Sequence, residues 1–115
     1  MCGIAAQFAY RPAAPPVARA SLLAVREAMA ARGPDGAGLW LSDDGRVGLA
    51  HRRLAIIDLS DQGAQPMARE TPAGRVHVVY NGEIYNFREL RAEMEALGDR
   101  FVTGSDTEVL LALYA

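Results

Sequence analysis

Apolar runs near the N-terminus predict a strand followed by a helix. Gly3 to Tyr10 is a short apolar run bounded by Arg11-Pro12, which is typical of a buried strand. After a Pro/Ala connector, apolar residues recur every three or four positions, as on one face of a helix. We expect this helix to have Pro16 in its first turn and to end near Arg32, where Gly33-Pro34 cannot continue it.

The next apolar runs predict antiparallel strands. Gly38–Ser42 and Val47–Ala50 flank Asp43-Asp44-Gly45-Arg46, a strong hairpin pattern. A third strand is predicted over Leu54–Ile57. The Gly, Pro, Ser and Gln content from Asp58 to Ala73 indicates a long loop.

The second half of the chain predicts two short strands and two helices. Strands are expected over Val76–Tyr80 and Phe101–Thr103. Asn86 is expected to cap a helix that ends at Gly98. A capping box, Ser105 with Glu108, opens a last apolar helix that has no closing Gly, Asn or basic turn. We therefore expect the chain to be truncated.

Composition narrows the chemistry. The chain has 115 residues, is 50% apolar and carries a net charge of -2, values typical of one globular domain or part of one. All twelve basic residues are Arg, which excludes lysine-based Schiff-base or P-loop chemistry within this segment. A pI near 5.6 without a basic run argues against nucleic acid as a partner. One cysteine and two histidines are too few for a disulfide or a structural metal site, so we expect no metal.

The N-terminus indicates a cytoplasmic protein. It lacks the charged and apolar regions of a secretory signal. No window approaches the roughly 18 apolar residues that cross a bilayer, so a membrane partner is not expected.

Cys2 is the most unusual candidate, because it directly follows Met1. Removal of Met1 would give this cysteine a free α-amino group. Such a group has an unperturbed pKa of about 7.7–8.0 and a thiol about 8.5, so the amine can accept the thiol proton without a histidine. The alternative is a small apolar residue buried at the start of a strand. Position alone does not decide between them.

Other motifs also allow two interpretations. Asn81-Gly82 after a β-run is most often a type I′ hairpin turn, but an amide side chain and a glycine N–H can also stabilise an oxyanion. Arg52 and Arg53 should point to opposite sides of a strand, so one can clamp a carboxylate. Asp106 complements the helix dipole or pairs with a substrate ammonium. The two histidines have no adjacent acid and are expected to be structural.

Six short motifs, in order, resemble one family, the glutamine-hydrolysing asparagine synthetases, in their N-terminal glutaminase region. They are Met1-Cys2-Gly3-Ile4, Arg32-Gly33-Pro34-Asp35, His51-Arg52-Arg53-Leu54 with Ile57-Asp58, Gly63-Ala64-Gln65-Pro66-Met67, Asn81-Gly82-Glu83-Ile84-Tyr85-Asn86 and Gly104-Ser105-Asp106. The resemblance implies a class II glutamine amidotransferase over residues 1–115, incomplete at its C-terminal end. It implies an α+β N-terminal-nucleophile hydrolase fold, with two stacked antiparallel sheets between helical layers.

The resemblance also implies roles for individual residues. Cys2 matches the nucleophile, Asn81 and Gly82 the oxyanion hole, and Arg53 the residue that holds the α-carboxylate of glutamine. The remaining matches are Glu83 and Asp106 around the α-amino group, Leu54 to Ile57 as pocket backbone, and Arg32 and Asn86 as supporting polar positions.

The implied reaction is hydrolysis of L-glutamine to glutamate and ammonia through a thioester. This segment needs no cofactor. In the full enzymes, a C-terminal synthetase domain uses ATP and magnesium to amidate aspartate. A homodimer is among the partners we expect. No Ser-Gly-Gly-x-Asp-Ser-like ATP-binding stretch occurs in these residues. The alternatives are a class II amidotransferase or asparagine synthetase-like protein with another ammonia acceptor, or a non-catalytic structural or regulatory module.

Overall fold

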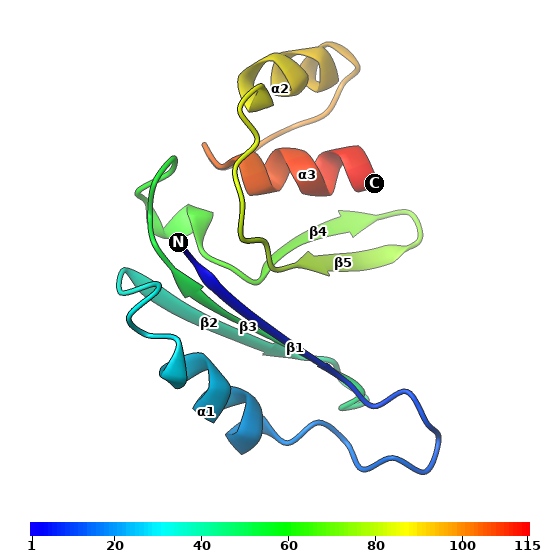
Figure 1. Cartoon of the computed structure of the whole chain (residues 1–115). Coiled ribbons are helices and arrows are strands. Elements are labelled where there is room, and N and C mark those ends of the chain that lie inside the picture. Colours follow the sequence, from blue (N-terminus) through cyan, green and yellow to red (C-terminus); the bar gives the residue numbers. More distant parts are fainter.

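The computed structural model describes residues 1–115 and has an α+β fold with two antiparallel sheets (Figure 1). The elements are β1 (Gly3–Phe8), α1 (Arg19–Ala28), β2 (Gly36–Leu41), β3 (Val47–Arg53), the 3-10 turn η1 (Asp61–Gly63), β4 (Met67–Thr71), β5 (Gly74–Val78), α2 (Phe87–Ala96) and α3 (Asp106–Tyr114). None of the helices is long and apolar enough to cross a membrane.

The first sheet has the strand order β1-β3-β2. The predicted hairpin is confirmed as β2 and β3, and its turn uses Gly45 with φ +68°. β1 pairs with β3 so that Gly3 lies opposite Arg52. The strand predicted over Leu54–Ile57 is wrong: β3 ends at Arg53 and the chain then leaves the sheet.

The second sheet is the β4–β5 hairpin, half of which the sequence pattern missed. The predicted loop from Asp58 to Ala73 contains η1 and β4. Three of the five β4 residues are polar or charged, so β4 does not have the apolar pattern of a buried strand, and it forms by pairing with β5. The strand predicted over Val76–Tyr80 is confirmed, two residues earlier than expected, as β5.

The elements stack in the order α1, the β1-β3-β2 sheet, the β4–β5 hairpin and α3, with α2 outside α3 (Figure 1). α1 packs on one face of the β1-β3-β2 sheet through Leu22, which is fully buried. The β4–β5 hairpin covers the other face, where Trp40 and His77 stack with ring centroids 3.8 Å apart. α3 packs on the hairpin and α2 on α3. This helix-sheet-sheet-helix order is the arrangement that the sequence resemblance implies.

Several predicted boundaries differ from the structure. α1 begins at Arg19, so Pro16 belongs to the connector. Phe101–Thr103 is irregular because the backbone of Val102 and Thr103 bonds to a side chain rather than to a strand. Asn86 is at the N-cap of α2 but makes no capping bond with its side chain, whereas Gly98 ends that helix as predicted, with φ +102°.

Candidate active site

A cavity of about 450 Å³ lies beside the N-terminal end of β1, a size typical of small-molecule sites. It collects residues from the two chain segments that follow β3 and β5 and from the start of α3. The candidate residues that line it are Cys2, Arg53, Leu54, Ile57, Asn81, Gly82, Glu83 and Asp106.

Cys2 lies one residue before β1, and the β1–β3 register places it beside the end of β3. Its sulfur accepts a hydrogen bond from the Leu54 amide at 3.3 Å and is 3.6 Å from the Leu54 carbonyl oxygen. Met1 lines the same cavity and is 67% exposed. The cysteine is thus half-buried at a cavity wall.

The two adjacent arginines point to opposite sides, as predicted. Arg52 donates to the Gly33 carbonyl at 3.0 Å and pairs with Glu27 near α1. Arg53 reaches the cavity, where its Nη1 donates to the Ser60 carbonyl at 2.5 Å and its Nη2 to the Asp58 carbonyl. These bonds hold the guanidinium at the cavity while leaving other N–H groups for a carboxylate.

Asn81 and Gly82 lie in the 80–84 loop, which joins β5 to the segment before α2. The hairpin interpretation is wrong, because a type I′ turn requires positive φ at both central residues and neither has it. Gly82 packs tightly against Tyr80: a Cβ added there would lie 2.6 Å from the phenol oxygen. The absence of a side chain at Gly82 therefore allows the Tyr80 ring to lie close to the loop.

Asp106 is the first residue of α3 and is only 6% exposed. Its Oδ2 accepts a hydrogen bond from the Ile84 amide at 2.9 Å, which fastens the end of the 80–84 loop. Glu83 lines the same cavity but is exposed. With Asp58, three carboxyl groups therefore share the cavity lining with one guanidinium.

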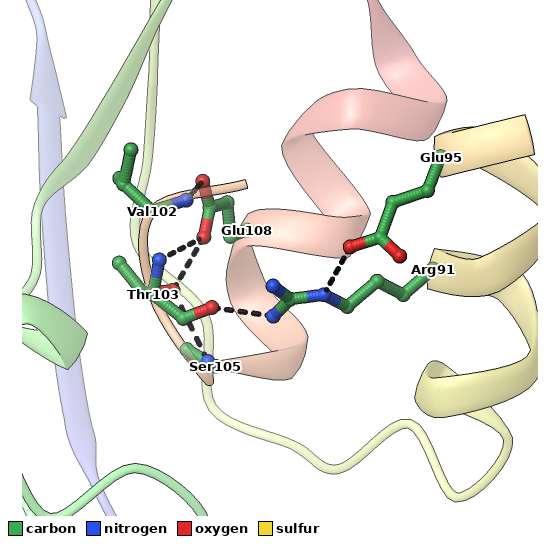
Figure 2. Close-up of polar contacts among 6 residues, drawn as sticks. All are labelled: Arg91, Glu95, Val102, Thr103, Ser105 and Glu108. Carbon is green, nitrogen blue, oxygen red and sulfur yellow. Dashed lines mark hydrogen bonds and ion pairs between the residues drawn. The ribbon is translucent and has the colours of Figure 1, made fainter. Parts of the chain in front are cut away.

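The segment before Asp106 is held by the carboxylate of Glu108 (Figure 2). Ser105 caps α3 by accepting from the Thr107 amide at 3.1 Å, as predicted. The other arm of the capping box is wrong: Glu108 accepts from the Val102 and Thr103 amides at 2.9 and 2.7 Å rather than from Ser105. The side chain thus holds the irregular segment that leads into Asp106.

Arg32 and Asn86 do not line the cavity. Arg32 Nε lies 3.4 Å from the Cys2 carbonyl oxygen, so it contacts the nucleophile candidate through the main chain only. Asn86 is exposed at the start of α2. Only Arg32 adjoins the candidate site.

Asp58 is a site residue to which the sequence interpretation gave no role. Hydrogen bonds from the Ser60 hydroxyl, the Ser60 amide and the Gly104 amide hold the pKa of its carboxyl group below the usual range. This carboxylate joins the segment after β3 to the segment before α3. The only sequence signal was its place in the Ile57-Asp58 motif.

The histidines lie outside the cavity lining. His77 stacks on Trp40, and burial lowers its pKa. His51 is fully buried with its Nε2 3.4 Å from the Tyr80 carbonyl oxygen, and burial lowers its pKa as well.

The whole chain, residues 1–115, matches the glutamine amidotransferase domain family. The chain belongs to this family. The α+β fold with two antiparallel sheets and three helices is that of an N-terminal-nucleophile hydrolase amidotransferase domain, as predicted.

The amidotransferase domain is similar to the N-terminal regions of several curated proteins. It is 43% identical to asparagine synthetase (glutamine-hydrolyzing) 1 of Bacillus subtilis and 44% identical to asparagine synthetase B (glutamine-hydrolyzing) of Escherichia coli, each over 99% of this chain. It is 48% identical to amidase chry2 of Gibberella zeae over 75% of this chain. The chain spans only 12% to 19% of the length of these three relatives.

Proposed function

We propose that this amidotransferase domain hydrolyses the side-chain amide of L-glutamine to glutamate and ammonia. The observation that carries the proposal is the shared cavity. It brings Cys2, Arg53, the Asn81-Gly82 pair and Asp106 together, although they come from four separate segments. A non-catalytic module has no physical need for this combination.

The first step uses Cys2 after Met1 has been removed. The free α-amine accepts the thiol proton, and the sulfur attacks the side-chain carbonyl carbon of glutamine, forming a C–S bond. The negative charge moves to the carbonyl oxygen, where the Asn81 amide and the Gly82 N–H stabilise it. The Leu54 amide, which donates to the sulfur, orients the nucleophile.

The second step releases ammonia. The C–N bond breaks as the protonated α-amine returns its proton to the leaving nitrogen, giving a thioester. Water then adds to the thioester, the C–S bond breaks, a proton from the water restores the Cys2 thiol, and glutamate is released. No oxidant or metal is consumed.

Substrate orientation follows from the charges at the cavity. Arg53 holds the α-carboxylate with the N–H groups that the Ser60 and Asp58 carbonyls leave free. Asp106 and Glu83 receive the α-ammonium group. Leu54 and Ile57 complete the wall beside the nucleophile.

We also propose that the ammonia serves ATP-dependent amidation of aspartate to asparagine in a longer cytoplasmic enzyme, which acts as a homodimer. The names of the two bacterial relatives support this acceptor. ATP and magnesium would bind to a synthetase domain outside these residues. Another ammonia acceptor is the second candidate, supported by the similarity to a protein named an amidase.

The experiment measures glutamate release from glutamine by the parent chain and by Cys2→Ala. We expect release by the parent only, and an intact mass that lacks Met1. Equal release by the two proteins would contradict the role of Cys2. A retained Met1 in an active protein would contradict the role of the α-amine.

A further inference from the structure

A buried side chain holds the residue that precedes Asn81. Gln65 Oε1 accepts a hydrogen bond from the Tyr80 amide at 2.6 Å. At the other end of the same side chain, Gln65 Nε2 donates to the Thr107 hydroxyl at 3.2 Å. Gln65 and Thr107 are both buried, with 9% and 2% exposed. The Gln65 amide therefore ties the start of the 80–84 loop to the first turn of α3.

The Tyr80 carbonyl group also faces a buried side chain. His51 Nε2 lies 3.4 Å from its oxygen. A carbonyl oxygen can only accept, so Nε2 carries the ring proton, and the buried Nδ1 has no partner. Both main-chain polar groups of Tyr80 are thus in contact with side chains from other parts of the fold.

The far end of the loop is held by the same helix. Asp106, which precedes Thr107 in α3, accepts from the Ile84 amide at 2.9 Å. The start and the end of the 80–84 loop are therefore both connected by hydrogen bonds to the first turn of α3, the start through Gln65 and the end directly. Asn81 and Gly82 lie between these two attachments.

The main chain at Gln65 is itself fixed by the first sheet. A Cβ added to Gly38 in β2 would lie 1.7 Å from the Gln65 carbonyl oxygen, so strand and loop are in direct contact. The amide of Gln65 thus starts from a rigid support rather than from a free loop.

We propose that Gln65 is a positioning residue for oxyanion stabilisation, because its bridge from the Tyr80 amide to Thr107 sets the place of Asn81 and Gly82. The inference rests on the proposed function. Oxyanion donors act only when they lie about 2.7–3.1 Å from the developing charge, and a misplacement of about 1 Å costs about 100-fold in rate. Gln65 also lines the cavity, but its side-chain amide bonds to Tyr80 and Thr107 rather than to Arg53 or Asp106, the residues proposed to hold glutamine.

The test replaces Gln65 with Met, which keeps the length of the side chain and removes both hydrogen bonds. We expect kcat for glutamate release to fall about 10- to 100-fold, with KM for glutamine changed less than about threefold. Gln65→Glu should recover most of the activity, because a carboxylate accepts from both the Tyr80 amide and the Thr107 hydroxyl. Gln7→Met, the same change on β1, should keep the parent kcat.

Two further measurements separate positioning from folding. Alkylation of Cys2 by iodoacetamide develops no oxyanion, so its rate should be the same in Gln65→Met as in the parent. If Gln65→Met does not fold, Thr107→Val replaces it in the test, since this substitution removes the hydrogen bond between Gln65 and the Thr107 hydroxyl. We expect a fall in kcat of about 5- to 10-fold for this variant.

The outcomes are distinct. A parent chain that releases glutamate no faster than Cys2→Ala overturns the proposed function, and this inference with it. An active parent whose folded Gln65→Met or Thr107→Val variant keeps the parent kcat overturns the inference alone. A rise in KM at unchanged kcat also overturns it, because that result would place Gln65 in substrate binding.

Discussion

Gly82→Ala is expected to abolish most of the proposed glutaminase activity through one methyl group. The added Cβ would lie 2.6 Å from the Tyr80 phenol oxygen and 2.7 Å from Cζ, whereas ordinary contacts begin at 3.4 Å. The loop and the ring must therefore separate by about 0.8 Å at this contact. Gln65 accepts from the Tyr80 amide at 2.6 Å and so holds the main chain of Tyr80, and the displacement is therefore shared between rotation of the phenol ring and a shift of Gly82 with its N–H donor.

The expected loss follows from the size of that displacement. A shift close to 1 Å costs about 100-fold in rate, and loss of one oxyanion donor costs about 100- to 1000-fold in kcat. We expect kcat for glutamate release from saturating glutamine to fall about 10- to 100-fold, because the ring and the loop share the displacement, with the thermal unfolding transition retained.

Gly36→Ala is the matched control. The same methyl group added to β2 would meet its nearest atom, Arg53 Cβ, at 3.5 Å, which is an ordinary contact. This variant should retain parent activity. A Gly82→Ala protein that turns over glutamine within threefold of the parent would refute the assignment of the 80–84 loop to the oxyanion, since the added Cβ crowds the Tyr80 ring beside the Gly82 N–H donor.

Three further changes test other parts of the site and its support. Arg53→Lys should raise KM for glutamine about 10-fold or more, because an ammonium lacks the planar fork that can bond to both backbone carbonyls and still bind a carboxylate through parallel N–H groups; an unchanged KM would contradict the carboxylate role. Glu108→Gln should lower the free energy of unfolding by about 1–3 kcal/mol, measured by urea denaturation, because its amide nitrogen would face a buried N–H donor; no change in the urea midpoint would be evidence against this network. Burial lowers the pKa of His51 in the folded state, so the unfolded chain binds the proton more tightly and stability falls as the pH drops below about 6.5. His51→Gln should therefore show a smaller loss of stability than the parent between about pH 7.5 and 5.5, and an identical loss would exclude this contribution.

The secondary structure could be predicted where local chemistry decides it. The Asp43-Asp44-Gly45-Arg46 turn determined the β2–β3 hairpin, because Gly45 adopts positive φ at little cost. Gly98 ended α2 for the same reason. β4 could not be predicted, since its polar residues become a strand only by pairing with β5.

The strand predictions for two irregular segments were wrong for a related reason. Apolar β-prone residues at Leu54–Ile57 and Phe101–Thr103 indicated strands, but their backbone groups bond to side chains instead. The Ala55 amide donates to Asp35, and the Thr103 amide donates to Glu108. Such side-chain partners lie up to 52 residues away in the sequence, as Cys2 does from the Leu54 amide, and leave no periodic pattern.

The sequence indicated which functional groups the site contains, but it did not indicate how they are arranged in space. Residue types alone indicated a cysteine beside a removable Met1, an arginine directed away from its neighbour, and an Asn-Gly pair that fits either a hairpin turn or an oxyanion site. Only the tertiary structure excluded the hairpin interpretation, because it leaves Gly82 without positive φ, and only the tertiary structure shows that Gly82 lines the same cavity as Cys2. Motif order determines which groups exist, whereas the distances between them depend on strand register and on buried bridges such as that of Gln65.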